Sequence, residues 1–547
     1  MEYSKLTKAM VVALVFVMGL GTAAPVFANG RNDYGNTATP IKHLVVIFQE
    51  NISFDHYFAT YPVATNPNGE PVFHARPNTP TVNGLSGALL TINPNFLNTA
   101  NSTGATNPFR LDRSQAATAD QGHNYTPEQT ATHMGLLDLY PASTGTAGPP
   151  PNAPPSAVTT KGLNMGYYDG NTVTALWNYA QFFAMNDNSF GSTFGPSTPG
   201  VLNLVAGQTN GIAQDTPGAA AKETDGGNNT KTLIGDADPI GDVCSTSSAQ
   251  VTMSGQNIGD LLNQADVTWG AFMGGFNINA TNSNGTTGCF RSTNSVYTGT
   301  TADYIPHHAF FQYFATTANP THARPTSVAE IGNPGPANHQ YDLSDFYAAI
   351  NHGNLPAVSF LKGIAIQDGH AGYSEPLDEQ TFIVTVVNAL EKSRFWSDTA
   401  VVVLYDDSDG WYDHQMSPII NQSTSPADTL TGAGSCGNGT STSLPGANAT
   451  DNPHAQGRCG YGVRQPLLVI SPWARENFVD HTVTDQSSVI HFIEDNWLSG
   501  QRLEGGSFDG VANSITQMFD FSQDSWGANR TLFLDPSSGQ PVGPRPW

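Results

Sequence analysis

Charged residues are scarce in this chain, and basic residues are the scarcest. Lys, Arg, Asp and Glu make up 12% of its 547 residues, and 21 basic residues face 45 acidic ones, giving a formal net charge of −24. A strongly acidic chain repels polyanions at long range, so we expect no nucleic acid partner. Any phosphate group that the chain binds must instead be met by local positive charge from a metal ion or from histidine.

Long apolar runs are also lacking beyond the beginning of the chain. Lys5 and Lys8 precede an apolar stretch over 9–20, and Val26-Phe27-Ala28 suits a signal peptidase site. This stretch is shorter than the ~20 residues needed to span a bilayer, so it predicts a signal peptide over 1–28 rather than a stable membrane anchor. We therefore expect a secreted or periplasmic protein. The sequence does not determine its oligomeric state.

Cysteine is rare, with four residues: Cys244, Cys289, Cys436 and Cys459. An even number in an exported chain predicts disulfides. The spacing proposes Cys244 with Cys289 and Cys436 with Cys459, because each pair closes a loop within one Gly/Asn/Ser-rich segment, although three connectivities are formally open. No CxxC spacing is present, which disfavours a zinc site.

Two apolar runs of strand length end directly in metal-competent side chains. Residues 44–48 lead into Gln49, Glu50 and Asn51, and residues 401–405 lead into Asp406-Asp407. If these strands are neighbours in a parallel sheet, the oxygens of Glu50, Asn51, Asp406 and Asp407 converge on one cation. Carboxylate and amide oxygens favour Ca²⁺, Mg²⁺ or Mn²⁺ over Zn²⁺. The alternative is that these acids cap loops or helix N-termini.

Helical and strand patterns alternate along the chain from residue 173 to residue 497. Such alternation predicts an α/β fold in which helices connect parallel strands. The predicted helices are 173–185, 341–350, 380–392 and 487–497, and the predicted strands are 267–272, 357–361, 400–405 and 466–470. We expect a single catalytic domain over 29–547, with irregular, loop-rich insertions near 61–160, 275–340 and 415–460.

Small hydroxyls and loop histidines complete the set of candidate site residues. The Gly- and Pro-rich residues 187–200 predict a sharp turn that presents Ser197 before the apolar run 201–205, which suits a helix whose N-terminus favours anions. Four histidines lie in predicted polar loops: His123, His307, His308 and His370. One such histidine is usually just solvated, but four together can hydrogen-bond phosphate oxygens and supply a general acid.

Four motifs, in order, resemble those of the bacterial phosphoesterase family that contains phosphatidylcholine-type phospholipases C and secreted acid phosphatases. Residues 49–58, QENISFDHYF, resemble its QENRSFDHYFG signature, and Gly195-Pro196-Ser197 resembles its GP-[ST] nucleophile motif. Residues 399–414 resemble its metal motif, which ends in Asp-Glu-x-x-Gly-x-x-Asp-His, and residues 469–474 resemble its late SPWA segment. The resemblance runs from about residue 41 to residue 497.

The resemblance implies an alkaline-phosphatase-like fold, with a mostly parallel sheet sandwiched by helices. It places the divalent metal on Glu50, Asn51, Asp406 and Asp407, and the nucleophile on Ser197. It also implies that substrate phosphate is contacted by Asn51, His123, His307, His308 and His370. The implied reaction passes through a phosphoserine that water then hydrolyses, on a small phosphate ester or a phospholipid head group.

Departures from the family motifs narrow the expected activity. Ile52 stands where the signature has Arg, Ala59 where it has Gly, and Asp407 where Glu is commoner, and residues 197–200 replace the Thr-x-Pro-Asn of phospholipases C. These features resemble the respiratory-burst-inhibiting acid phosphatase branch, so we expect a secreted metal-dependent acid phosphatase. Cationic histidines would favour activity at acidic pH.

Several alternatives stay open from the sequence. The chain could be a phospholipase C that cleaves choline phospholipids, or a non-enzymatic exported binding protein that holds structural calcium. Thr193 and Thr198 are alternative hydroxyls if the turn has a different register. Asp55 and His56 have no matched partner elsewhere in the chain, so we expect them to brace the loop after the first strand.

Overall fold

The computed structural model describes residues 37–147, 160–227, 229–430, 436, 457–522 and 530–543. Residues Tyr34–Trp547 form one compact unit. The predicted signal peptide over 1–28 lies outside the described residues, as do parts of the predicted insertions near 61–160 and 415–460. The division into a leader and one catalytic domain with three insertions therefore stays a prediction.

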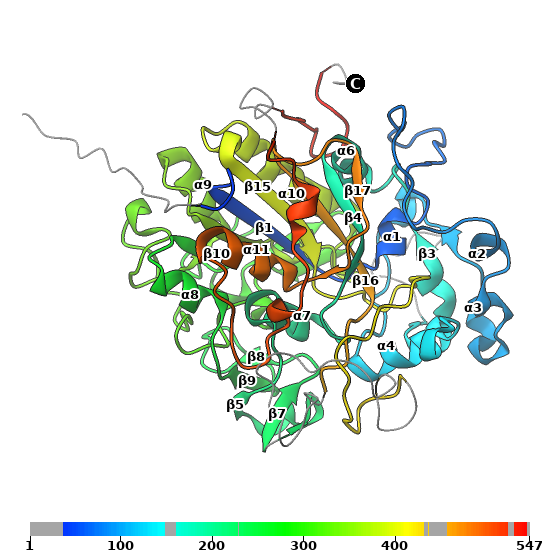
Figure 1. Ribbon diagram of the computed structural model, residues 1–547, viewed down its shortest axis with the longest axis horizontal. Coiled ribbons are helices and arrows are strands. Elements are labelled where there is room, and N and C mark those ends of the chain that lie inside the picture. Colours follow the sequence, from blue (N-terminus) through cyan, green and yellow to red (C-terminus); the bar gives the residue numbers. More distant parts are fainter. Residues whose placement is uncertain are drawn as a thin grey trace, which may run out of the picture. The chain divides into compact units, whose positions relative to one another are not determined.

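A nine-stranded sheet runs through this unit (Figure 1). In spatial order its strands are β13 (Gln340–Asp342), β10 (Trp269–Met273), β14 (Val358–Lys362), β1 (His43–Gln49), β15 (Thr399–Tyr405), β16 (Arg464–Ile470), β4 (Ala184–Phe190) and β17 (Phe478–Asp480), with β18 (Thr484–Asp485) also beside β4. Every residue of β1 and β15 is buried, as expected for apolar strands in the middle of a covered sheet.

The strand directions confirm a mostly parallel sheet, with one correction. The pairs from β13 through β15 are all parallel, but β16 runs antiparallel to both β15 and β4. Alternating helices and strands predicted that the strand at 466–470 would be parallel. That prediction was wrong, because β16 pairs antiparallel with β15 and so begins at the edge of the sheet where β15 ends. No helix of the described residues lies between the two strands.

Helices cover both faces of the sheet. Side chains at positions 269 and 272 of β10 point to opposite faces. Trp269 lies against Gly259 of α8 (Ile258–Gln264), whereas the ring of Phe272 lies 5.4 Å from that of Phe346 in α9 (Leu343–His352), so α8 and α9 cover opposite faces. On the face of α8, α7 (Ser197–Ala206) contacts both α8 and α11 (Ser488–Trp497). On the other face, α10 (Pro376–Glu391) accepts a hydrogen bond from Tyr405 of β15 and contacts α6 (Thr174–Phe182).

The remaining helices and strands are short. The small helices are α1 (Phe54–Phe58), α2 (Ala88–Thr91), α3 (Pro94–Leu97), α4 (Tyr125–Thr132) and α5 (Tyr140–Ser143). The small sheets pair β2 (Phe109–Arg110) with β3 (Gly166–Tyr167), β6 (Glu223–Gly227) with β7 (Thr230–Leu233), β11 (Ser292–Ser295) with β12 (Gly299–Ala302), and β9 (Gln250–Met253) with β5 (Ile212–Asp215) and β8 (Asp238–Pro239). Those in the predicted insertions are α2 to α5, β2, β11 and β12, whereas α1, β3 and β5 to β9 lie outside them. In the described part of the chain, no helix has the length and apolarity that crossing a bilayer requires.

Three predicted helices differ from the structure at their ends. The helix predicted over 380–392 begins at Pro376 and ends at Glu391. The helix predicted over 173–185 ends at Phe182, and Ala184 and Met185 begin β4, because an apolar helix end and a buried strand start have the same composition. The helix predicted from residue 341 begins at Leu343, since Asp342 is its N-cap and Tyr341 belongs to β13. Both proposed disulfides, Cys244–Cys289 and Cys436–Cys459, are confirmed.

Arg464 at the start of β16 holds the loop after β1 against the loop after β15. Its guanidinium is fully buried and donates to Asp55 Oδ1 at 3.1 Å and to both carboxylate oxygens of Asp413 at 3.1 Å. It also lies 4.3 Å above the ring of Phe54. Asp55 thus braces its loop, as the sequence predicts, and His56 does so too by stacking on Trp411 at 3.8 Å.

We predict that Arg464→Met lowers the free energy of unfolding by about 3–5 kcal/mol, because Asp55 and Asp413 then remain buried without their cation. Urea denaturation followed by circular dichroism measures this change. Arg324→Met is the matched control: Arg324 pairs with Asp345 but is 27% exposed, so its loss costs about 1 kcal/mol or less. Equal destabilisation by the two substitutions would contradict the role given to Arg464.

Candidate active site

The register of β1 against β15 brings the two predicted strand ends together. The strands pair in parallel from His43 with Thr399 to Gln49 with Tyr405, so the next residues, Glu50 and Asp406, leave the sheet side by side. The chains stay joined beyond the strands, because Ile52 N donates to Asp407 O at 2.9 Å. All four predicted metal ligands are buried at this carboxyl edge, where ligand sites of α/β sheets form.

Ser197 is the hydroxyl that faces the predicted ligands. Its Oγ donates to Glu50 Oε2 at 2.8 Å and lies 3.3 Å from Asp407 Oδ2. The other two candidate hydroxyls are engaged elsewhere: Thr198 Oγ1 donates to Asp236 at 3.1 Å, and Thr193 Oγ1 accepts from Asn203 at 3.0 Å.

Glycine permits the close approach of α7 that places Ser197 here. A Cβ added at Gly200 would lie 2.5 Å from the carbonyl oxygen of Asp406, so any larger residue would push α7 away from the end of β15. Glu128 of α4 fixes the turn before α7, since it accepts from Gly195 N at 2.8 Å and from Ser408 Oγ at 2.5 Å. Burial raises the pKa of Glu128 to about 7.

Asn51 adopts a strained backbone and leaves its amide oxygen without a partner. Its φ is +65°, its N donates to Asp406 Oδ1 at 2.8 Å, and its Nδ2 donates to Asp409 Oδ1 at 3.0 Å. Asn51 Oδ1, Asp406 Oδ2 and Asp409 Oδ2 are all buried and have no hydrogen-bond partner among the described residues. Buried acceptors of this kind normally have a donor or a cation, so the donor set fits a hard divalent ion.

Lys362 is a functional candidate that the sequence reasoning missed. It is the last residue of β14, the other neighbour of β1, and its buried ammonium contacts Glu50 Oε1. Burial lowers its pKa, although the surrounding carboxylates oppose that shift. A lone lysine at the end of an apolar strand has no sequence signal of its own, because the same pattern is typical of strands that end at the surface.

The four predicted histidines come together around these carboxylates. His308 Nδ1 lies 3.4 Å from Glu50 Oε1, and its ring is 4.4 Å from that of His307. His123 Nδ1 lies 3.1 Å from Asp409 Oδ1, and its ring is 5.9 Å from that of His370. His307 stands further out, with 30% of its side chain exposed and its Nδ1 3.7 Å from Asp238 Oδ1.

The surroundings lower the pKa of two of these imidazoles and raise the pKa of the other two. Burial lowers the pKa of His370 to about 4, and burial together with the neighbouring histidines holds the pKa of His308 well below its ordinary value. Burial also opposes the charged form of His123 and His307, but nearby carboxylates outweigh it: Asp407 and Asp409 raise the pKa of His123, and Asp238 and Asp236 raise that of His307. The set therefore offers both neutral and cationic imidazoles.

Nearby positive charge does not fully balance the negative charge of the buried carboxylates. Burial, and then the charge of Asp406, raise the pKa of Asp407 well above its ordinary value, and burial raises the pKa of Asp368 to about 8. Asp368 is a second residue that the sequence reasoning missed; its carbonyl accepts from Glu50 N at 2.7 Å, and its Oδ2 lies 3.7 Å from His308 Nδ1.

Three other groups of ligand-type side chains occur in the described residues. Asp120, His123 and His370 form one beside the site, whereas Asp55, Asp413 and His414 surround Arg464. The third contains Asp242, His322 and Cys244, whose sulfur is committed to a disulfide. The predicted set at Glu50 and Asp406 is not among these groups, and Lys362 lies against Glu50 there.

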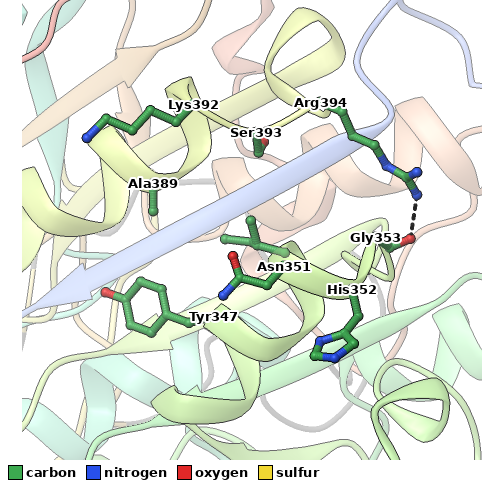
Figure 2. A pocket seen from close by; sticks show the side chains of 9 residues that line it. Tyr347, Asn351, His352, Gly353, Ala389, Lys392, Ser393 and Arg394 are labelled. Atoms are coloured by element: carbon green, nitrogen blue, oxygen red, sulfur yellow. Dashed lines mark hydrogen bonds between the residues drawn. The ribbon is translucent and has the colours of Figure 1, made fainter.

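A separate hollow of about 470 Å³ lies between the C-terminal ends of α9 and α10 (Figure 2). Its polar lining includes Asn351, His352, Lys392 and Arg394, whose guanidinium donates to Gly353 O at 2.7 Å. Basic side chains at helix C-termini are well explained as partners of the helix dipole. No predicted site residue lines this hollow, so we separate it from the candidate active site.

Comparison with known proteins agrees with the geometry. The model of the phosphoesterase family matches residues 41–498, most of the chain. The chain belongs to the phosphoesterase family. The match covers both strand ends, the Ser197 turn and all four loop histidines, so the predicted family is confirmed, while the acid phosphatase branch stays a prediction.

Similar proteins of this family are named phospholipases C. Phospholipase C A of Mycobacterium tuberculosis is 25% identical over 533 residues, covering 95% of this chain and 84% of that relative. Non-hemolytic phospholipase C of Pseudomonas aeruginosa is 24% identical over 502 residues, covering 88% of this chain and 57% of that relative. The chain is therefore similar over nearly its whole length to phosphoesterases, some of which are considerably longer.

Solved structures give weaker matches. Murine ectonucleotide pyrophosphatase/phosphodiesterase 5 matches with a TM-score of 0.28 and 13% identity, over 64% of this chain and 95% of that one. A protein of the alkaline phosphatase superfamily from Vibrio parahaemolyticus matches with a TM-score of 0.27 and 12% identity, over 80% of each chain. Scores this low do not establish a fold. The α/β assignment rests instead on the sheet and the helices that cover it.

We predict that a divalent cation stabilises the chelator-treated protein. At a free concentration of about 100 times its dissociation constant, binding adds about 2.7 kcal/mol to the free energy of unfolding. Thermal denaturation with added Ca²⁺, Mg²⁺, Mn²⁺ or Zn²⁺ measures the effect and ranks the ions. Asp406→Asn should abolish the rise in melting temperature, whereas Asp225→Asn, at an exposed acid, should retain it. A rise that survives Asp406→Asn would show that the ion binds elsewhere.

Proposed function

We propose that the chain is an exported, metal-dependent phosphoric ester hydrolase whose nucleophile is Ser197 and whose preferred substrates are phosphomonoesters. The single observation that carries the proposal is the position of Ser197 Oγ, 2.8 Å from Glu50 and 3.3 Å from Asp407. A hydroxyl buried among carboxylates at a helix N-terminus is well placed for attack on phosphorus. A purely structural calcium site gives no reason for this placement.

Each part of the site has a proposed role. A bound divalent cation, held by Glu50, Asn51, Asp406 and Asp407, would neutralise phosphoryl oxygens and favour the ionised hydroxyl of Ser197. The Ser197 hydroxyl loses its proton to water, and regains one when the phosphoserine is hydrolysed. Its Oγ forms a bond to phosphorus in line with the ester oxygen, whose bond to phosphorus breaks, giving a phosphoserine and a free alcohol. The N-terminal end of α7 and the imidazoles of His307, His308 and His370 orient the phosphoryl group.

The departing alcohol requires a proton. His123 is the first candidate donor, because the contact of its Nδ1 with Asp409 favours the cationic ring. In the second half of the reaction, water attacks phosphorus, the bond to Ser197 Oγ breaks, and inorganic phosphate leaves. The same imidazole can then accept a proton from the attacking water.

We predict that Ser197→Ala lowers kcat for a chromogenic aryl phosphate by about 10⁴-fold or more, because the reaction loses its covalent step. Steady-state kinetics at saturating substrate measure this loss. Thr193→Val is the matched control, because its hydroxyl only accepts from Asn203, and its kcat should stay within about tenfold of the parent. Retained activity in Ser197→Ala would contradict the assignment of the nucleophile.

Phospholipase C activity is a second candidate function, favoured by the names of the relatives. The local residues favour a monoesterase instead. Ile52 stands where the family signature has Arg, and Ser197 and His308 are 1% and 2% exposed, which leaves little room for a second esterified group.

We therefore predict that kcat/KM for p-nitrophenyl phosphate exceeds that for p-nitrophenylphosphorylcholine by at least about tenfold. Both reactions release the same chromophore, so one assay compares them directly. A preference of the same size for the diester would assign the chain to the phospholipases C and leave the role of Ser197 intact.

A further inference from the structure

An apolar patch lies on the surface of the first insertion, formed by Ile92, Phe96, Leu97, Met134 and Leu136. Their exposed fractions are 59%, 49%, 60%, 60% and 59%. Side chains of this size are normally exposed singly, and a cluster of them marks an interaction surface. Figure 1 shows α2 and α3, which flank Ile92, at the right-hand margin of the view.

Hydrogen bonds hold the two halves of the patch together. Asn95 Nδ2 donates to Leu137 O at 2.7 Å, and Asn95 Oδ1 accepts from Tyr140 N at 3.0 Å. Asn98 Nδ2 also donates to Asp138 Oδ2 at 2.9 Å. The exposed side chains thus project from a backbone that buried polar contacts fix, and not from loops that could fold over and cover them.

The half of the patch that residues 81–109 form has no charged side chain, which is unusual in this chain. Residues 81–109 contain no Asp, Glu, Lys, Arg or His, although the chain as a whole carries a charge of −24. On the facing segment, His133 and Asp138 pair with each other at 2.6 Å. A neutral apolar surface on an acidic protein suits an uncharged, apolar partner.

The patch is connected to the candidate active site. Asn93 Nδ2 donates to the hydroxyl of Tyr412 at 3.1 Å, and Tyr412 belongs to the same loop as Asp407. On the other half, α4 joins the loop of His123 to the segment of Met134, a path of about 12 Å for eight residues of helix. A groove of about 490 Å³ lined by Val63, Val82, Leu85 and Leu90 continues the apolar surface beside α2.

We propose that this patch docks the protein onto the surface of a phospholipid bilayer with zwitterionic head groups. Insertion of aliphatic and aromatic side chains into the interface buries apolar area without a charged contact. A protein partner fits less well, because the patch has none of the Trp, Tyr or Arg residues that dominate protein interfaces and no charge to guide association. The net charge of −24 further disfavours anionic membranes.

Vesicle flotation with the full chain tests the proposal. We expect binding to phosphatidylcholine vesicles that changes little with salt and weakens as phosphatidylglycerol is added. The triple variant Ile92→Ser, Phe96→Ser, Leu97→Ser should lose at least about tenfold in partition coefficient. Phe290→Ser, at a side chain 77% exposed on a different insertion, should bind like the parent.

Two further measurements make the result decisive. Hydrolysis of soluble aryl phosphate should be unchanged in the triple variant, which shows that it is folded and separates failure of docking from failure of the proposed catalytic function. Absence of binding by the parent, or equal binding by the triple variant, would overturn the proposal. A lipid-free dimer that the triple variant loses would also overturn it, in favour of a second copy of the chain.

Discussion

The burial of several carboxylates at one edge of the sheet is the constraint on which the rest of the site depends. Glu50, Asp406 and Asp407 are at most 2% exposed, and parallel pairing of β1 with β15 leaves them no way to move apart. Like charges in a low-dielectric interior repel strongly, so such a cluster persists only if cations or protons compensate it. The apolar strands that position these acids therefore also create the need for positive charge.

The chain meets this need only in part. Lys362 approaches from β14 and contacts Glu50, and His123 approaches from a loop and contacts Asp409. Yet, within the part of the chain that the structure describes, Asp406 Oδ2 and Asn51 Oδ1 have no hydrogen-bond partner, and burial and Asp406 raise the pKa of Asp407. The cationic side chains of the protein therefore do not neutralise all of the buried carboxylates. That shortfall is a physical reason for a divalent ion, and it needs no reference to relatives.

The sequence predicts the centre of the site better than its surroundings. Glu50 and Asp406 were predictable because an apolar strand that ends abruptly in acids is a strong local pattern, and the hydroxyl turn before α7 is another. Lys362, Asp368 and Glu128 were not, because each reaches the site through tertiary packing and looks locally like an ordinary polar residue. The reversed direction of β16 was missed for a related reason, because the direction of a strand depends on the connection that precedes it and not on the strand's own residues.

Because Ser197 is enclosed, we expect the edge of the sheet to recognise the phosphoryl group and the surrounding insertions to recognise the alcohol. Ser197 is 1% exposed, and its hydroxyl contacts Glu50 and Asp407. Under the proposed function, the phosphoryl group therefore enters the site while most of the alcohol stays outside. Discrimination among alcohols then falls to the surrounding surfaces, which come from the insertions rather than from the sheet. The sheet edge can therefore keep one chemistry while the insertions change the substrate. Under the proposed function, we expect the insertion around residues 81–109, which has no charged side chain, to contribute to the choice between lipid and soluble esters.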